Sequence, residues 1–225
     1  MVPTHSPRAD DPAYRAAITD LLGVLAYGEL TAFTRMAADS DLAPTLRLKA
    51  DLAGLAAAEY RQFANLLERM REMGVDPEQA MTPFVATFAA YHDRTAPKGW
   101  LEGLLKAYVG DGIAKDFYRE MAGFVDEQTQ AVMNHALEDG GESEFVVAVI
   151  RDAIRADPTA AGRLALWGRR LLGEALSHGQ EVAATRTAMS TLLVGGDHDL
   201  MEVGAMFTRL TEKHRERMAR LGLTA

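Results

Sequence analysis

The sequence contains no cysteine, which excludes disulfide bonds, thiolate zinc sites, iron–sulfur clusters and a cysteine nucleophile. It also lacks a glycine-rich phosphate loop after a strand and a nucleophile elbow. Positive charge is not in excess, because the formal net charge is -8. Proteins that coat nucleic acid cluster lysine and arginine, so this charge argues against that role.

No apolar run reaches the roughly 18 residues that a membrane span needs. The opening segment, MVPTHSPRADDPAYR, lacks the apolar centre of a signal peptide. We therefore expect a soluble cytoplasmic protein without a membrane partner. With 225 residues and 48% hydrophobic content, the chain is large enough to bury a sizeable core.

Apolar residues recur at spacings of three and four along nearly the whole chain, and strand-like alternation is absent. The fold class is therefore predicted to be all-α. Helix starts are expected at Asp41, at Asp76 followed by Pro77, and at Asp126. The expected helices, with boundaries good to a few residues, are 11–38, 42–73, 77–92, 98–122, 126–155 with a bend at Gly140-Gly141, 159–192 and 197–221.

The connections predict a topology. Two antiparallel hairpins, 11–73 and 98–155, are joined by a connection of about 24 residues that contains its own short helix. Two hairpins with a long crossover are typical of a ferritin-like four-helix bundle. We expect one domain over residues 1–225, with the bundle at about 11–155 and two accessory C-terminal helices at about 159–221. Whether residues 74–97 form a lid or only a crossover is left open.

Acidic residues interrupt the apolar faces of the four predicted bundle helices. Glu29, Glu59, Asp111 and Asp139 each have apolar neighbours at helical spacing. The first two lie 30 residues apart and the last two 28 residues apart, one pair in each hairpin. An isolated buried carboxylate is too costly to keep without compensation, so four converging carboxylates favour a shared site with cations or protons.

In each hairpin the second carboxylate is followed three residues later by another polar side chain, Gln62 after Glu59 and Glu142 after Asp139. This pattern matches the di-metal carboxylate arrangement of helical bundles, and oxygen-rich sites suit iron or manganese. The alternative is that each acidic residue lies at the edge of its apolar stripe and reaches solvent. The bundle would then be a metal-free binding or scaffold protein.

Two further groups of polar residues have simpler explanations. Glu174, His178 and Glu181 share one face of the 159–192 helix, where a small metal site or an acid–base pair is conceivable. The polar face of an outer helix explains the same pattern, and we favour it. His214 lies among the basic residues Lys213, Arg215, Arg217 and Arg220, which we interpret as a solvated helix end.

Four segments, AYGEL, AAAEYRQF, YVGDGIAKDFY and LEDGGESEF, resemble the ligand segments of MiaE-like ferritin-like proteins, which include tRNA 2-methylthio-isopentenyladenosine hydroxylases. The resemblance covers roughly residues 15–150. It implies a non-haem di-iron oxidoreductase that activates dioxygen with an external electron donor. Its implied substrate is a modified tRNA base or a small apolar molecule, and a homodimer is a possible assembly.

Carried across by resemblance, Glu29, Glu59, Asp111 and Asp139 are the implied metal ligands. Gln62 and Glu142 stand where the family has histidine, and two of its glutamates are shortened to aspartate in this chain. These departures put metal occupancy and catalysis in question. His135, one turn before Asp139, is an alternative nitrogen ligand, although a lone histidine on a helix is more often exposed or already hydrogen-bonded.

Overall fold

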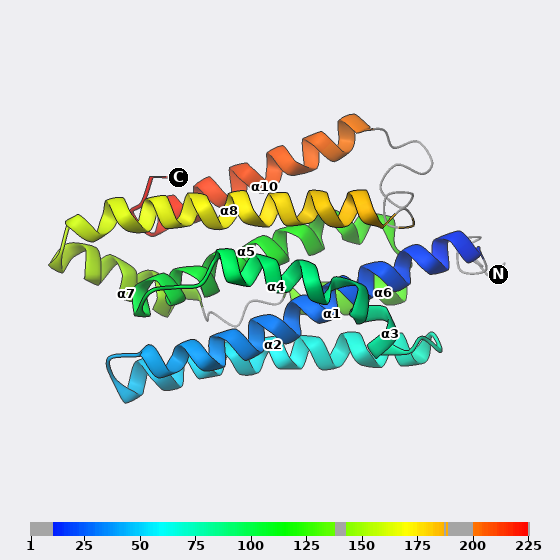
Figure 1. Cartoon of the computed structure of the whole chain (residues 1–225), viewed down its shortest axis with the longest axis horizontal. Helices are drawn as coiled ribbons and strands as arrows, with labels where there is room; N and C mark the ends of the chain where they lie inside the picture. The colour runs from blue at the N-terminus through cyan, green and yellow to red at the C-terminus, as the bar shows by residue number, and fades with distance from the viewer. Residues whose placement is uncertain (1–10, 138–142, 187, 189–199, 225) are drawn as a thin grey trace, which may run out of the picture.

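The computed structural model describes residues 11–137, 143–186, 188 and 200–224, and these residues form helices and short connections without a strand (Figure 1). The prediction of an all-α fold is confirmed. In Figure 1, α1 and α2 lie on one side of the molecule, α8 and α10 lie on the other side, and α5 lies between them.

The first hairpin consists of α1 (Pro12–Asp39), the 3₁₀ turn η1 (Ser40–Leu42) and α2 (Leu46–Glu72). Its two helices form the most extensive packing contact in the molecule. The predicted cap of the second helix is wrong. Asp41 lies in η1 and pairs with Lys49, while the hydroxyl of Thr45 accepts the hydrogen bond from the Leu48 amide at 3.2 Å. Thr45 is the better cap because it immediately precedes the first helical residue.

The crossover between the hairpins contains α3 (Pro77–Met81), η2 (Thr82–Phe84) and α4 (Val85–Arg94). Asp76 caps α3 as predicted, because its carboxylate accepts from the Glu78 amide at 3.0 Å. The α3 backbone comes very close to α1 at Gly23. An added Cβ there would lie 2.2 Å from the carbonyl oxygen of Ala80. Only glycine lets the crossover settle this closely on the bundle.

The second hairpin begins with α5 (Trp100–Met121), η3 (Ala122–Phe124) and α6 (Glu127–Ala136), and continues with α7 (Ser143–Ala156). The expected bend at Gly140-Gly141 lies outside the described residues. Asp126 caps α6 as predicted by accepting from the Thr129 amide at 3.0 Å. The buried Arg69 guanidinium of α2 holds this corner, donating to Asp126 at 3.1 Å and to Gln128 at 2.8 Å.

Helices α8 (Thr159–Thr185) and α10 (Leu200–Arg220) pack against α5 (Figure 1). The interpretation of 213–220 as a fully solvated helix end is wrong at two positions. His214 is completely buried, and Arg217 pairs with the buried carboxylate of Asp116 on α5. The Arg217 side chain thus contacts α5, whereas Lys213 and Arg215 are exposed.

One described segment, Pro12–Leu42, is long and apolar enough for a membrane span by length and composition alone, with half of its most apolar window buried in the fold. This is weak evidence for a span. A core helix of a helical bundle passes the same test.

Two apolar clusters fill the bundle, one towards each end. The first includes Met36, Ala56 and Val109, and the second includes Leu25, Phe63 and Tyr118. Along α1, α2 and α5 the chain passes from one cluster to the other, and a carboxylate occupies the transition on each helix. The polar interior of the bundle therefore lies between two well-packed apolar regions.

Candidate functional site

Glu29 of α1, Glu59 of α2 and Asp111 of α5 meet in the middle of the bundle. The three residues interact electrostatically, and Glu29 and Glu59 are hydrogen-bonded to each other. Glu29 is only 6% exposed. The Glu59 side chain as a whole is half-buried, yet burial is the largest influence on the pKa of its carboxyl group. The structure thus brings together three of the four carboxylates singled out in the sequence.

The two glutamates raise each other's tendency to bind a proton. Burial raises the pKa of Glu29, while its hydrogen bonds to Glu59 and Tyr118 oppose that rise. The pKa of Glu59 lies well above its usual range, because of burial first and then because of the hydrogen bond to Glu29 and the charges of Glu29 and Asp111. The same hydrogen bond thus lowers the pKa of Glu29 and raises that of Glu59, so Glu59 is the carboxyl group of the pair that binds a proton more readily.

Tyr118 and Lys115 of α5 complete the cluster. The fully buried Tyr118 hydroxyl donates to Glu29 Oε1 at 2.5 Å. Lys115, one turn after Asp111 on the same helix, pairs with its carboxylate at 3.1 Å. Sequence reasoning missed both roles, although Lys115 has the i, i+4 spacing of a helical ion pair and Tyr118 lies on the same face.

The remaining predicted ligands differ in their placement. Gln62 is half-buried, and its side-chain oxygen Oε1 is fully buried with no hydrogen-bond partner among the described residues. Asp139 and Glu142 lie outside the described residues. His135 is exposed on α6, and the structure gives no support for it as a ligand.

The donors present match a hard divalent cation in chemistry. Among residues 11–137, 143–186, 188 and 200–224, no three histidine or acidic side chains lie close enough to hold a metal ion as placed. The pKa of Glu59 is raised well above its usual range, however, and within the described residues no donor reaches the buried Gln62 oxygen. These donors are oxygens, which suits manganese or iron better than a soft metal.

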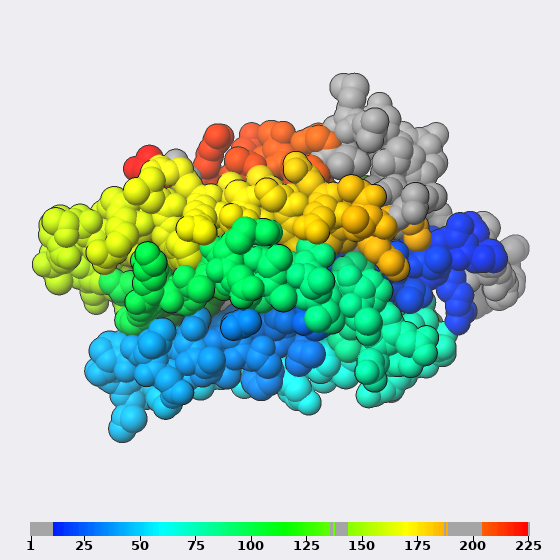
Figure 2. Space-filling model, in the orientation of Figure 1, coloured from blue at the N-terminus to red at the C-terminus, as the bar shows by residue number. Residues whose placement is uncertain are grey.

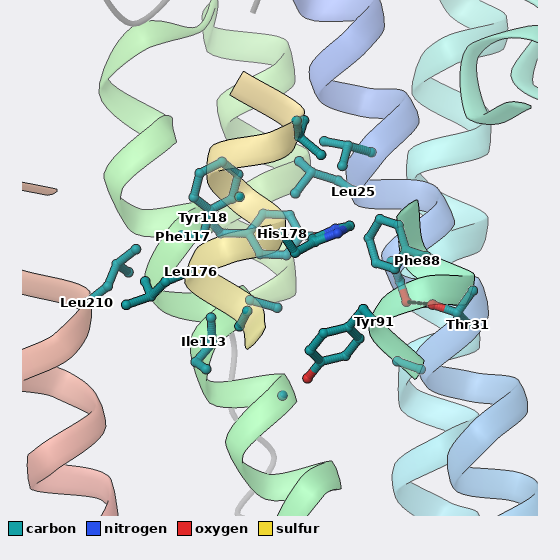
Figure 3. Close-up of a pocket in the computed structure, with 18 of the residues that line it drawn as sticks. Leu25, Thr31, Phe88, Tyr91, Ile113, Phe117, Tyr118, Leu176, His178 and Leu210 are labelled. Carbon is teal, nitrogen blue, oxygen red and sulfur yellow. Dashed lines mark hydrogen bonds between the residues drawn. The ribbon is translucent and has the colours of Figure 1, made fainter. Parts of the chain in front are cut away.

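A cavity of about 250 Å³ adjoins the carboxylates. Glu29, Asp111 and Tyr118 form part of its wall, and α4, α8 and α10 contribute most of the rest (Figure 3). The other lining residues are mainly apolar, including Leu25, Phe88, Ile113, Phe117, Leu176 and Leu210. In Figure 2 the green segment that contains α4 covers the molecule between α8 and α1. The crossover is therefore part of the cavity wall.

The sequence matches the model of a family described as the ferritin-like domain of actinomycetes over residues 12–196. The chain belongs to this ferritin-like family. The structure is also similar to a protein from Synechococcus with aldehyde deformylating oxidase activity, at a TM-score of 0.67 and 20% sequence identity. That match covers 96% of this chain and 94% of the other, and it supports the shared fold. No curated protein sequence matches the chain.

Two histidines of this ferritin-like chain, His92 and His178, line the cavity, and sequence reasoning predicted this for neither of them. His178 lines the cavity, so the interpretation of its helix face as a solvated polar face is wrong for this residue. Glu174, by contrast, pairs with Arg94 at 2.5 Å, and Glu181 is exposed. A signal for His178 was present, since Leu171 and Val182 share its helical face and are both buried. His92 of α4 also lines the cavity and was not singled out.

Proposed function

We propose that this ferritin-like protein is an oxidoreductase whose divalent metal centre, at Glu29, Glu59 and Asp111, acts on an apolar ligand in the adjoining cavity. One observation carries the proposal. Two of these carboxylates lie in the wall of a 250 Å³ cavity whose other walls are mainly apolar. The oxidase activity named for the Synechococcus protein of the same fold supports the reaction class.

Each residue of the site has a defined task in this proposal. Glu29, Glu59, Asp111 and the Gln62 oxygen would hold the cation, together with Asp139 and Glu142 of the same predicted ligand set. A bound iron or manganese pair would supply dioxygen activation. Tyr118 fixes the orientation of Glu29 through its 2.5 Å hydrogen bond, and Glu59 releases its proton when a cation arrives. The apolar walls keep water away from the ligand.

The proposed reaction also needs a source of electrons. The chain has no cysteine to act as a redox group. We propose that an external electron donor supplies them.

The experiment is a calorimetric titration of the purified protein with iron and with manganese. Replacing Glu59 with glutamine removes one charged ligand, and we expect metal binding to weaken at least tenfold, as even outer-shell losses do in metal sites. Glu68→Gln is the matched control, because Glu68 is exposed on the same helix and should leave affinity unchanged. Unchanged affinity in Glu59→Gln would refute the metal site.

A second variant tests the ligand set without removing a carboxylate from the described cluster. Gln62→His/Glu142→His would restore the nitrogen donors of the family pattern and remove one formal charge. We expect iron to bind this variant more tightly than it binds the parent, because imidazole suits iron well. Equal and negligible iron binding by both proteins would mean that these positions do not face a metal cavity.

A second function is favoured by a different observation. Lys115 pairs with Asp111, and the raised pKa of Glu59 favours uptake of a proton by the glutamate pair, so the charge of the cluster can be compensated without a metal. On this alternative the protein is a metal-free bundle that binds or carries an apolar ligand. Purified protein with no bound metal, together with unaltered ligand binding after Glu59→Gln, would support it.

The finer expectation concerns the substrate. The MiaE-like resemblance suggests that the substrate is an isopentenyl side chain on a modified tRNA base. This side chain is small, branched and apolar, and it would therefore suit the mainly apolar cavity wall. Mass spectrometry of tRNA nucleosides after incubation with metal-loaded protein, dioxygen and a reductant tests it. The absence of hydroxylated isopentenyl nucleosides, alongside turnover of a simple apolar substrate, would refute the tRNA substrate.

A further inference from the structure

Four rings form the cavity wall opposite the bundle. His178 projects from α8, and His92, Phe88 and Tyr91 project from α4 (Figure 3 labels all but His92). The ring centroids of His178 and Phe88 are 4.4 Å apart in an edge-to-face arrangement, and those of Tyr91 and His92 are 5.2 Å apart. The Tyr91 ring also contacts His178, and the Phe88 ring also contacts His92. The two imidazoles are therefore held in one aromatic wall.

The ring nitrogens of both histidines have no hydrogen-bond partner within the described part of the chain, and all four nitrogens are buried from solvent. A buried polar group without a partner costs free energy, and folded proteins contain few such groups. Burial also lowers the pKa of His178, and it lowers the pKa of His92 to about 3, with the charges of Lys106 and Arg35 adding to the effect. Both imidazoles are thus neutral at pH 7, and each offers one donor and one acceptor.

We propose that His178 and His92 form a subsite for the hydroxyl group of an alcohol whose apolar part fills the cavity. This inference rests on the proposed function and narrows its ligand class to an apolar chain bearing one uncharged oxygen. A hydroxyl is the matching partner once the rings turn a nitrogen towards the cavity, because it accepts from one imidazole nitrogen and donates to another.

Other head groups fit this wall less well. A hydrocarbon would leave the nitrogens unsatisfied, and a carbonyl would satisfy only a donor. A carboxylate would add a buried charge. Of the nearby cations, Arg94 pairs with Glu174, Lys106 donates to the Thr95 carbonyl at 2.7 Å, and Arg35 is exposed. The wall therefore selects a neutral group with both hydrogen-bonding functions.

The experiment compares the binding of 1-hexanol, hexane and hexanoate to the full-length protein by calorimetry. We expect the parent to bind 1-hexanol up to about tenfold more tightly than hexane, the value of one net hydrogen bond. His178→Phe keeps an aromatic ring, slightly larger than imidazole, and removes its nitrogens, so it should remove this preference while hexane still binds. His135→Phe is the matched control, because His135 is exposed on α6, and it should retain the preference.

Two further measurements separate this subsite from the proposed function. Ala175→Trp places a large ring at a residue of the cavity wall and should abolish binding of both 1-hexanol and hexane. If His178→Phe fails to fold, His92→Phe replaces it. Nuclear magnetic resonance of the isotope-labelled histidines in the parent should also show side-chain shifts with 1-hexanol and none with hexane.

The outcomes are distinct. Equal affinity of 1-hexanol for the parent and for His178→Phe would overturn the hydroxyl subsite, while hexane binding blocked by Ala175→Trp would leave the apolar cavity of the proposed function intact. Tighter binding of hexanoate than of 1-hexanol would overturn the ligand class. If neither 1-hexanol nor hexane binds the parent, the subsite and the ligand cavity are refuted together.

Discussion

Gly23 allows a sharp test of how the crossover sits on the bundle. Replacing it with alanine places a Cβ 2.2 Å from the Ala80 carbonyl oxygen and 2.8 Å from the carbonyl carbon. Real Cβ contacts are essentially never shorter than 3.0 Å, and the atoms in the way are backbone atoms. The α3 helix must therefore move away from α1, and Phe84, 3.2 Å from the new Cβ, must move with it.

Two opposing terms set the magnitude. Overpacking of a closed contact costs about 1–3 kcal/mol, and a clash with backbone belongs at the upper end of that range. Alanine also stabilises a helix by about 1 kcal/mol relative to glycine, because its helix propensity is higher. We expect a net loss of about 2 kcal/mol in the free energy of unfolding. For a chain of this length, that corresponds to a melting temperature lower by about 4–8 °C.

The assay is thermal unfolding followed by circular dichroism, with Gly54→Ala as the control. Gly54 is exposed within α2, and no atom lies within 4 Å of its added Cβ. That substitution should raise the melting temperature by about 2–3 °C, because only helix propensity changes. If Gly23→Ala melts at or above the parent, α3 does not pack on α1 as described, and the reasoning is refuted.

Three further predictions concern buried polar groups. Tyr118→Phe removes the hydrogen bond to Glu29 and should lower stability by about 2 kcal/mol, measured by urea unfolding. Burial, and then Arg217, lowers the pKa of His214 to about 4 from its usual 6.5, so folding should lose up to about 3 kcal/mol as the pH falls from 6.5 towards 4. Arg69→Lys loses the planar guanidinium contacts to Asp126 and should lower the melting temperature by several degrees.

Each of these three predictions has a control variant. Tyr60→Phe removes a hydroxyl from an exposed ring and should leave stability unchanged. His214→Phe should make the loss of stability between pH 6.5 and 4 smaller by about 3 kcal/mol, while His92, whose pKa is lowered to about 3, keeps its own contribution. An equally steep loss in this variant would contradict the role given to His214. Arg71→Lys changes an exposed arginine on the same helix as Arg69. Equal melting temperatures for the Arg69 and Arg71 variants would contradict the buried network.

Much of the fold was readable from the sequence because local signals determine it. Period-3.6 apolar spacing marked the helices, and Asp76 and Asp126 marked two of their starts, since capping depends on residues one to three positions away. Asp41 failed as a cap because η1 continues the turn after α1 and leaves Thr45 beside the first helical residue. Several residues near a boundary can cap, and the local sequence does not choose between them.

The candidate site was only partly readable. The apolar neighbours of Glu29, Glu59 and Asp111 placed each on an inner helix face, and burial then required that they share charge or protons. The cavity was not readable, because its wall joins residues far apart in the sequence, such as Phe88 of α4 and His178 of α8. Which helix covers which face depends on packing between α5, α8 and α10, and periodicity within one helix does not specify it.

The three carboxylates and the four aromatic and histidine rings of the cavity wall come from different segments of the chain. The carboxylates come from α1, α2 and α5, while the rings come from the crossover and from α8. Substitutions in residues 85–94 therefore change the cavity wall without replacing any of the three carboxylates. If the proposed ligand binds in the cavity, exchange of this segment would alter which ligand fits while the acidic cluster stays the same.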